Sequence, residues 1–119
     1  MCLANRAEIR AHIDQNYYPM NFKIDEIRDG YKFNETCQDS VPQSIMAFLE
    51  STGFEDAIRN AISLGGDSDT LAAITGSIAQ MHYGVPKEIE KEALSHLDHR
   101  LRAIYDEWVQ FSKDQGITK

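Results

Sequence analysis

The sequence predicts an all-α fold, and three observations support that prediction. The few Pro and Gly residues stand between segments whose apolar residues recur at helical spacing. No segment shows the strict apolar–polar alternation that indicates a half-buried strand. The 119 residues, 42% apolar and 26% charged, suffice for one modest core. We therefore expect a single domain, residues 1–119, built as a compact helical bundle of about five helices with a buried central helix.

The first part of the chain predicts one helix and a long connector. A weakly amphipathic helix is expected over residues 5–17, where Tyr18-Pro19 ends it because the residue before proline disfavours the helical region. The following stretch to Asp39 resembles a connector, with one helical turn near residues 24–27. A connector this long in a small domain usually packs against the core or carries function.

Two amphipathic helices are expected next. Pro42 suits the first position of one helix, where its missing N–H is not needed. Thr52 and Glu55 fit a capping box that opens the other. Gly65-Gly66 ends that second helix, because glycine adopts left-handed backbone angles without strain. Its expected buried stripe consists of Ala57, Ile58, Ala61, Ile62 and Leu64.

The segment from Asp67 to Tyr83 predicts the central helix. It is apolar on nearly all sides, and a helix of this kind is buried on most of its faces. Tyr83-Gly84 ends it, and Pro86 opens a last, long helix. In that helix apolar residues recur at steps of three and four, as Leu94, Leu97, Leu101, Ile104, Trp108 and Phe111. This seam can pack inside the bundle or pair two chains, and its length of about two and a half heptads favours the first.

The net charge and the cysteine content limit which binding partners and which cellular compartment the sequence predicts. A net charge of -7 argues against nucleic acid or an anionic membrane as the partner, because phosphates are repelled. No apolar stretch is long enough to span a bilayer. With only Cys2 and Cys37, and no leader pattern over residues 1–6, we expect a reduced, cytoplasmic protein. An acidic protein that handles a phosphate-bearing ligand would need a bound cation or a local arginine.

The motif Asp67-x-Asp69-Thr70, between the glycine break and the central helix, is the candidate site. Residues two apart in a regular helix point about 200° away from each other. If Asp67 occupies the non-helical N-cap, however, its side chain turns back over the first turn, where Asp69 and the Thr70 hydroxyl can join it. Oxygen clusters of this type bind Mg²⁺ and Mn²⁺. The motif therefore predicts part of a metal site.

The same motif is also ordinary helix capping. Aspartate at an N-cap, followed by an acid in the first turn, is stabilised by the free N–H groups and the helix dipole. Spacing alone favours this interpretation over metal binding. Three oxygen groups also fall short of the roughly six that Mg²⁺ prefers, so another segment would have to contribute ligands.

A family resemblance favours the metal site. The late metal-binding motif of the ADP-ribosylglycohydrolase family is similar to residues 65–79, which read GGDSDTLAAITGSIA. Residues 40–49 (SVPQSIMAFL), 54–58 (FEDAI) and 83–86 (YGVP) also resemble that family, in the same order. The similarity covers residues 31–86, and the ordered series is far more specific than an isolated Asp-x-Asp-Thr.

The resemblance implies an all-helical hydrolase with two Mg²⁺ or Mn²⁺ ions in a cleft. Such an enzyme removes ADP-ribose from a modified protein or a small molecule by attack at the anomeric carbon of the distal ribose. Carried over, Asp67, Asp69 and Thr70 are metal ligands, and Asp69 bridges the two ions. Nothing in the resemblance assigns a catalytic residue to this chain. Paired cations would let an acidic protein tolerate a pyrophosphate ligand.

The chain departs from the family pattern in one respect. Family enzymes are longer, and their first half supplies a Thr-Asp-Asp run of metal ligands that occurs nowhere here. We therefore expect residues 1–119 to be the carboxy-terminal part of an ADP-ribosylglycohydrolase-like domain, associated with a missing first half or with further copies. The alternative is a non-catalytic helical interaction module, or a degenerate family member without activity, that associates through the apolar seam of the last helix.

Overall fold

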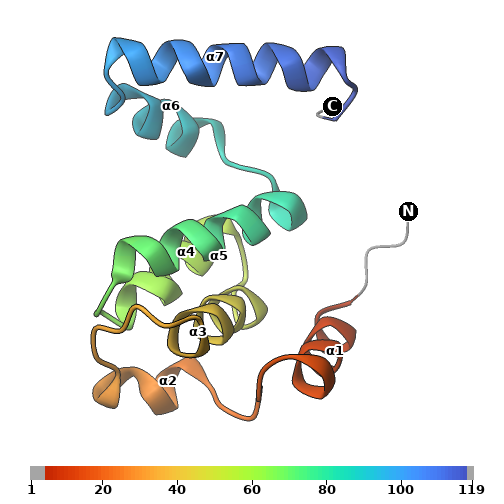
Figure 1. Ribbon diagram of the computed structural model, residues 1–119, viewed down its shortest axis with the longest axis vertical. Helices are drawn as coiled ribbons and strands as arrows, with labels where there is room; N and C mark the ends of the chain where they lie inside the picture. Colours follow the sequence, from red (N-terminus) through yellow and green to blue (C-terminus); the bar gives the residue numbers. More distant parts are fainter. Residues whose placement is uncertain (1–4, 118–119) are drawn as a thin grey trace. The chain divides into compact units, whose positions relative to one another are not determined.

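The computed structural model describes residues 5–117, which contain α-helices, one 3-10 turn and no strand (Figure 1). The all-α prediction is confirmed. None of the described helices is long and apolar enough to cross a membrane. The chain divides into two compact units, Met1–Gly84 and Val85–Lys119. The described elements are α1 (Arg6–Asn16), α2 (Ile24–Ile27), the 3-10 turn η1 (Arg28–Gly30), α3 (Cys37–Leu49), α4 (Phe54–Ser63), α5 (Ser68–Tyr83), α6 (Lys87–Ser95) and α7 (His99–Asp114).

In the first unit, α5 is the central helix, because it packs against both α3 and α4 (Figure 1). Leu71, Thr75 and Ala79 recur every fourth residue and are fully buried. The Thr75 hydroxyl donates a hydrogen bond to the Ser44 carbonyl oxygen of α3 at 2.9 Å. The opposite face of α5 is exposed within the described part of the chain, with Met81 76% accessible. The helix is thus covered on two sides rather than all round.

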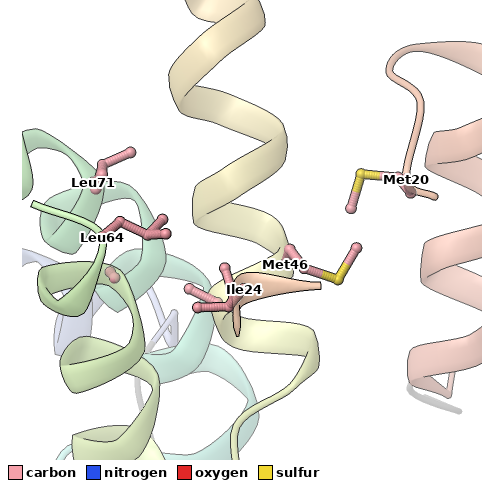
Figure 2. Close-up of a cluster of buried hydrophobic side chains, with 7 residues drawn as sticks. Met20, Ile24, Met46, Leu64 and Leu71 are labelled. Atoms are coloured by element: carbon pink, nitrogen blue, oxygen red, sulfur yellow. The ribbon is translucent and has the colours of Figure 1, made fainter. Parts of the chain in front are cut away.

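The connector between α1 and α3 packs into the core of this unit. Met20 and Ile24 are each 1% exposed and meet Met46 of α3, Leu64 after α4 and Leu71 of α5 (Figure 2). Burying an aliphatic side chain of this size stabilises the fold by about 1.5–3 kcal/mol. The short helix α2 confirms the predicted turn at residues 24–27. The connector is therefore a structural element that places the residues following it.

The helix α1 is held by polar contacts more than by burial. Asn5 caps it, since its Oδ1 accepts a hydrogen bond from the Glu8 N–H at 2.9 Å. None of its described side chains is buried. The Arg10 Nε donates to the Met20 carbonyl oxygen at 2.9 Å, and the Arg6 guanidinium lies over the Tyr83 ring at 5.3 Å. Two arginines thus join α1 to the rest of the unit.

The start of α3 differs from the prediction. The helix begins at Cys37, so Pro42 lies inside it rather than at its first position. The reason is upstream hydrogen bonding: Asn34 Nδ2 and Thr36 Oγ1 both donate to Asp39 Oδ2, at 2.8 and 3.0 Å. These bonds fix the first turn before the proline is reached.

The predicted capping box of α4 is also wrong. Gly53 is the N-cap, and the N–H and hydroxyl of Thr52 donate to Asp56 Oδ2, at 2.8 and 3.0 Å. Glu55 pairs instead with Arg59 one turn later, at 2.6 Å. Two adjacent acids were both eligible by spacing, and the extended conformation of Gly53 decides between them. Of the predicted stripe, Ala57, Ala61 and Leu64 are buried, whereas Ile62 is 51% exposed.

In the second unit, the single long helix predicted from Pro86 is two helices. The helix α6 ends at Ser95, and Asp98 caps α7 by accepting a hydrogen bond from the Leu101 N–H at 2.8 Å. The Tyr105 hydroxyl donates to Glu90 Oε1 at 2.6 Å and joins the two helices. The apolar spacing continues through the break, which explains the missed cap; this split and the short α2 account for seven described α-helices where about five were expected.

The predicted apolar seam is half-buried at Leu94 and Leu97 and lies on an exposed face of α7 from Leu101 onward. Its residues Leu101, Ile104, Trp108 and Phe111 are 43–58% exposed, and the Trp108 and Phe111 rings lie 5.8 Å apart. Tyr105 and Val109 are half-buried, and Ser112 is 1% exposed. Packing within this unit therefore uses a different face of α7 from the one that the periodicity predicted.

Candidate functional site

The glycine break before α5 has the backbone that the sequence predicts. Gly65 and Gly66 adopt left-handed φ angles of 73° and 61°. An added Cβ at Gly66 would lie 3.0 Å from Tyr31 Cε1 and 3.1 Å from the Lys32 carbonyl oxygen. A glycine is thus required at position 66 for two reasons: the backbone angle is left-handed, and the connector lies too close for a side chain.

Asp67 occupies the N-cap position of α5 but does not cap it. Its backbone angles are φ -80° and ψ 62°, and within the described residues its side chain makes no capping hydrogen bond. Asn5 and Asp98, at the same position of α1 and α7, both make such a bond. Capping was the simpler interpretation of the motif, and it does not account for the Asp67 carboxylate.

Asp67 and Asp69 lie at the N-cap and in the first turn of α5. The pKa of Asp69 is lowered, first by a hydrogen bond with the Asp67 side chain and then by the backbone N–H groups of Asp69 and Thr70. Two residues on opposite sides of a helix could not interact in this way. Asp67 is half-buried, whereas Asp69 and Thr70 are exposed. The non-helical angles of Asp67 therefore bring the two acids to one side.

These groups fit part of a divalent-cation site. Carboxylate and hydroxyl oxygens are the hard ligands that Mg²⁺ and Mn²⁺ prefer. Between residues 5 and 117, however, no group of three or more His, Cys, Asp or Glu side chains is placed to hold a metal. No contact joins the Thr70 hydroxyl to the two acids among the described hydrogen bonds. Water or other protein segments would have to supply most of the roughly six oxygens around Mg²⁺.

An open depression lies beside this turn, and only the length of the connector indicated it. Its volume is about 420 Å³. Tyr31 and Lys32, the residues that contact Gly66, also line it. The long connector had been expected to pack or to carry function, but its individual residues were not singled out. The lining consists of Glu26, Ile27, Gly30, Tyr31, Lys32, Phe33, Asn34, Asp39 and Gln43.

Tyr31 joins the depression to the glycine turn. Its hydroxyl donates a hydrogen bond to the Asp39 carbonyl oxygen at 2.5 Å. Its pKa is raised by burial and then by the negative charges of Asp39 and Asp67, so the hydroxyl remains a neutral donor. Nearby, the Gln43 Oε1 is buried and has no hydrogen-bond partner among the described residues.

Comparison with known proteins gives a consistent result. The sequence model of one family, described as ADP-ribosylglycohydrolase, matches residues 3–116. ADP-ribosylhydrolase ARH3 of Danio rerio is 34% identical over 71 residues, which are 54% of this chain and 19% of that protein. ADP-ribosylarginine hydrolase Tri1 of Serratia proteamaculans (strain 568) is 36% identical over 88 residues, 66% of this chain and 23% of that protein.

A second Tri1, from Pseudomonas putida (strain GB-1), is 32% identical over 84 residues, again 66% of this chain and 23% of that protein. The chain therefore spans only 19–23% of the length of the curated relatives that it matches. No solved structure matches it.

Proposed function

The chain belongs to the ADP-ribosylglycohydrolase family, and on that premise we propose that it is part of a divalent-metal-dependent hydrolase. The reaction is cleavage of the glycosidic bond between ADP-ribose and an acceptor group. The observation that carries the proposal is the Asp67 carboxylate, which makes no capping hydrogen bond at the start of α5 among the described residues, with Asp69 in the same first turn. Family enzymes act through metal ions, and these acids are the oxygen ligands that such ions need.

The proposed ligands are Asp67, Asp69 and Thr70, which would hold Mg²⁺ or Mn²⁺. Bound cations supply positive charge that orients ribose hydroxyl groups and activates water. The chain itself contributes two features. The glycine turn sets the direction of the two carboxylates, and the N–H groups in the first turn of α5 orient Asp69. Its net charge of -7 makes some compensation necessary for a pyrophosphate substrate.

The depression beside the turn is the proposed surface for part of the ADP-ribose. Tyr31 and Phe33 offer aromatic faces for a planar base, and Lys32 between them offers a cation for a phosphate. The substrate would be an ADP-ribosylated protein or small molecule. Because the two Tri1 relatives are named as ADP-ribosylarginine hydrolases, ADP-ribosylated arginine is the first acceptor to test.

The remaining ligands are proposed to come from outside residues 1–119. The chain contains no Thr-Asp-Asp run and covers 19–23% of its relatives. We therefore describe it as the carboxy-terminal part of an ADP-ribosylglycohydrolase-like domain that is active only with a first half. Its cytoplasmic location stays a prediction.

A segment exchange tests this proposal. The matching segment of Tri1 from Serratia proteamaculans is replaced by the corresponding residues of this chain, and release of ADP-ribose from an ADP-ribosylarginine peptide is measured with Mg²⁺. The hybrid is expected to be active and to lose activity on Asp69→Ala. Glu55→Ala, which removes an exposed acid paired with Arg59, is the matched control and should stay active. A folded hybrid that keeps full activity with Asp69→Ala contradicts the proposed ligand set.

One observation favours a second function, that of a non-catalytic interaction module. The seam on α7 exposes four large apolar side chains in one stripe, and such stripes mark association surfaces. Sedimentation of the wild-type chain and of Trp108→Lys distinguishes the cases. This second function predicts that the wild type self-associates and the variant does not. A monodisperse wild-type monomer over a wide concentration range argues against self-association.

A further inference from the structure

The connector contacts the glycine turn before α5 at Gly66. Gly66 is in close contact with the Tyr31 ring and the Lys32 backbone, as the 3.0 and 3.1 Å distances from an added Cβ show. A Cβ added at Gly65 would have no described atom within 4 Å. The contact is therefore specific to the residue that directly precedes Asp67, whose backbone angles determine where its carboxylate extends.

The Tyr31 ring is itself fixed on its other sides. Its hydroxyl donates to the Asp39 carbonyl oxygen in the first turn of α3 at 2.5 Å. The half-buried ring also packs against the core cluster that includes Met20, Ile24 and Met46. Because α3 and the core are rigid, the ring is a fixed surface for the glycine turn to rest on.

We propose that Tyr31 is a positioning residue for the cation half-site: its ring supports Gly66 and thereby sets the direction of Asp67 and Asp69. This inference rests on the proposed function and adds to it a residue outside the ligand motif. The same ring lines the adjacent depression.

The competing explanation is that Tyr31 stabilises only the core. Phe22 provides the matched control, because it is also half-buried and packs against the same core cluster. It neither contacts Gly66 nor lines the depression among the described residues. Removing either ring should therefore loosen the core, but only Tyr31 should affect the turn. Tyr31→Phe keeps the ring and removes only the hydroxyl.

The test begins without metal, with amide ¹H–¹⁵N spectra of the wild type, Tyr31→Ala, Tyr31→Phe and Phe22→Ala. Tyr31→Ala is expected to shift the amide signals of Gly66, Asp67 and Asp69, whereas Phe22→Ala leaves these signals in place. Tyr31→Phe should restore the wild-type positions. Unshifted signals in a folded Tyr31→Ala overturn the inference. If Tyr31→Ala does not fold, Tyr31→Leu replaces it with the same expectation.

The second measurement is Mn²⁺ affinity by electron paramagnetic resonance on the same variants. Tyr31→Ala is expected to bind Mn²⁺ about tenfold more weakly, the usual effect of losing a residue that orients a ligand. Tyr31→Phe and Phe22→Ala should bind as the wild type does. Wild-type affinity in a folded Tyr31→Ala overturns the positioning role. A wild type that binds no Mn²⁺ refutes the proposed half-site, and the amide signals then decide alone whether Tyr31 sets the turn.

Discussion

The helices α5 and α7 both follow an aspartate at the N-cap, yet the two aspartates behave differently. Asp98 has the extended angles φ -66° and ψ 167° and accepts a hydrogen bond from the Leu101 N–H at 2.8 Å. Asp67 has φ -80° and ψ 62° and makes no such bond within the described structure. The residue type is the same, so the preceding backbone decides: two left-handed glycines lead into Asp67.

The difference also shows which acid is structural. Asp98 satisfies one of the free N–H groups at the start of α7, which is the usual contribution of a cap to stability. Asp67 instead makes no capping bond in the described structure, although its residue type favours one at this position. A local conflict of this type is expected at a functional site rather than at a purely structural one.

The largest expected effect on stability comes from disrupting the glycine turn that precedes Asp67. Gly66→Ala places a Cβ 3.0 Å from the Tyr31 ring at a φ of 61°. Backbone strain and overpacking together should lower the free energy of unfolding by about 2–4 kcal/mol in urea denaturation. Gly65→Ala is the control, since it has a similar φ and open space, and should cost only about 1 kcal/mol. Equal losses would show that the contact with the connector does not matter.

Removing the structural aspartate should have the next largest effect. Asp98→Ala leaves the Leu101 N–H without its partner and should destabilise α7 by about 1 kcal/mol. Hydrogen exchange of the α7 amides measures this directly, with Asp98→Asn as a control that can still accept the bond. Unchanged hydrogen exchange in Asp98→Ala would mean that the Asp98 cap is not needed for α6 and α7 to form as separate helices.

The same substitution at the other aspartate should not destabilise its helix. Asp67→Ala removes no capping bond among the described residues. The midpoint of thermal unfolding without metal is therefore expected to stay close to that of the wild type. A loss comparable to that of Asp98→Ala would show that Asp67 is a structural residue after all.

The smallest effect concerns the hydrogen bond that joins α7 to α6. The Glu90 side chain raises the pKa of Tyr105, and partial burial raises it further. A raised pKa means that folding favours the neutral phenol, so this contribution is fully present below pH 10 and is lost as the pH rises through the folded pKa. Tyr105→Phe should therefore reduce the alkaline loss of stability, measured by urea denaturation at several pH values. An identical pH profile in the variant would exclude the bond as its source.

The sequence predicted the parts of the molecule that depend on local rules. The glycine break, the end of α5 at Gly84 and the all-α architecture follow from residue conformational preferences and apolar spacing. It failed where several local contacts were possible and the spacing did not choose between them. Asp56 rather than Glu55 bonds Thr52, and the break at Asp98 interrupts an otherwise regular apolar pattern.

The candidate site shows the same division. Spacing placed Asp67 at the N-cap, but it could not show that the described side chain makes no capping hydrogen bond. The contribution of Tyr31 was not predictable, because it depends on a contact between a connector and a turn 35 residues later, at Gly66. Cys2, one of the two cysteines used to infer a reduced compartment, lies outside the described residues.

The most direct test of the central claim is where Mn²⁺ binds on the chain itself. Paramagnetic broadening of amide signals is followed in the wild type, in Asp69→Asn and in Asp98→Ala. The cation half-site predicts broadening confined to residues around Gly66 to Leu71, its loss in Asp69→Asn and its retention in Asp98→Ala. Broadening that is absent, spread over all acidic segments, or unchanged in Asp69→Asn would contradict it.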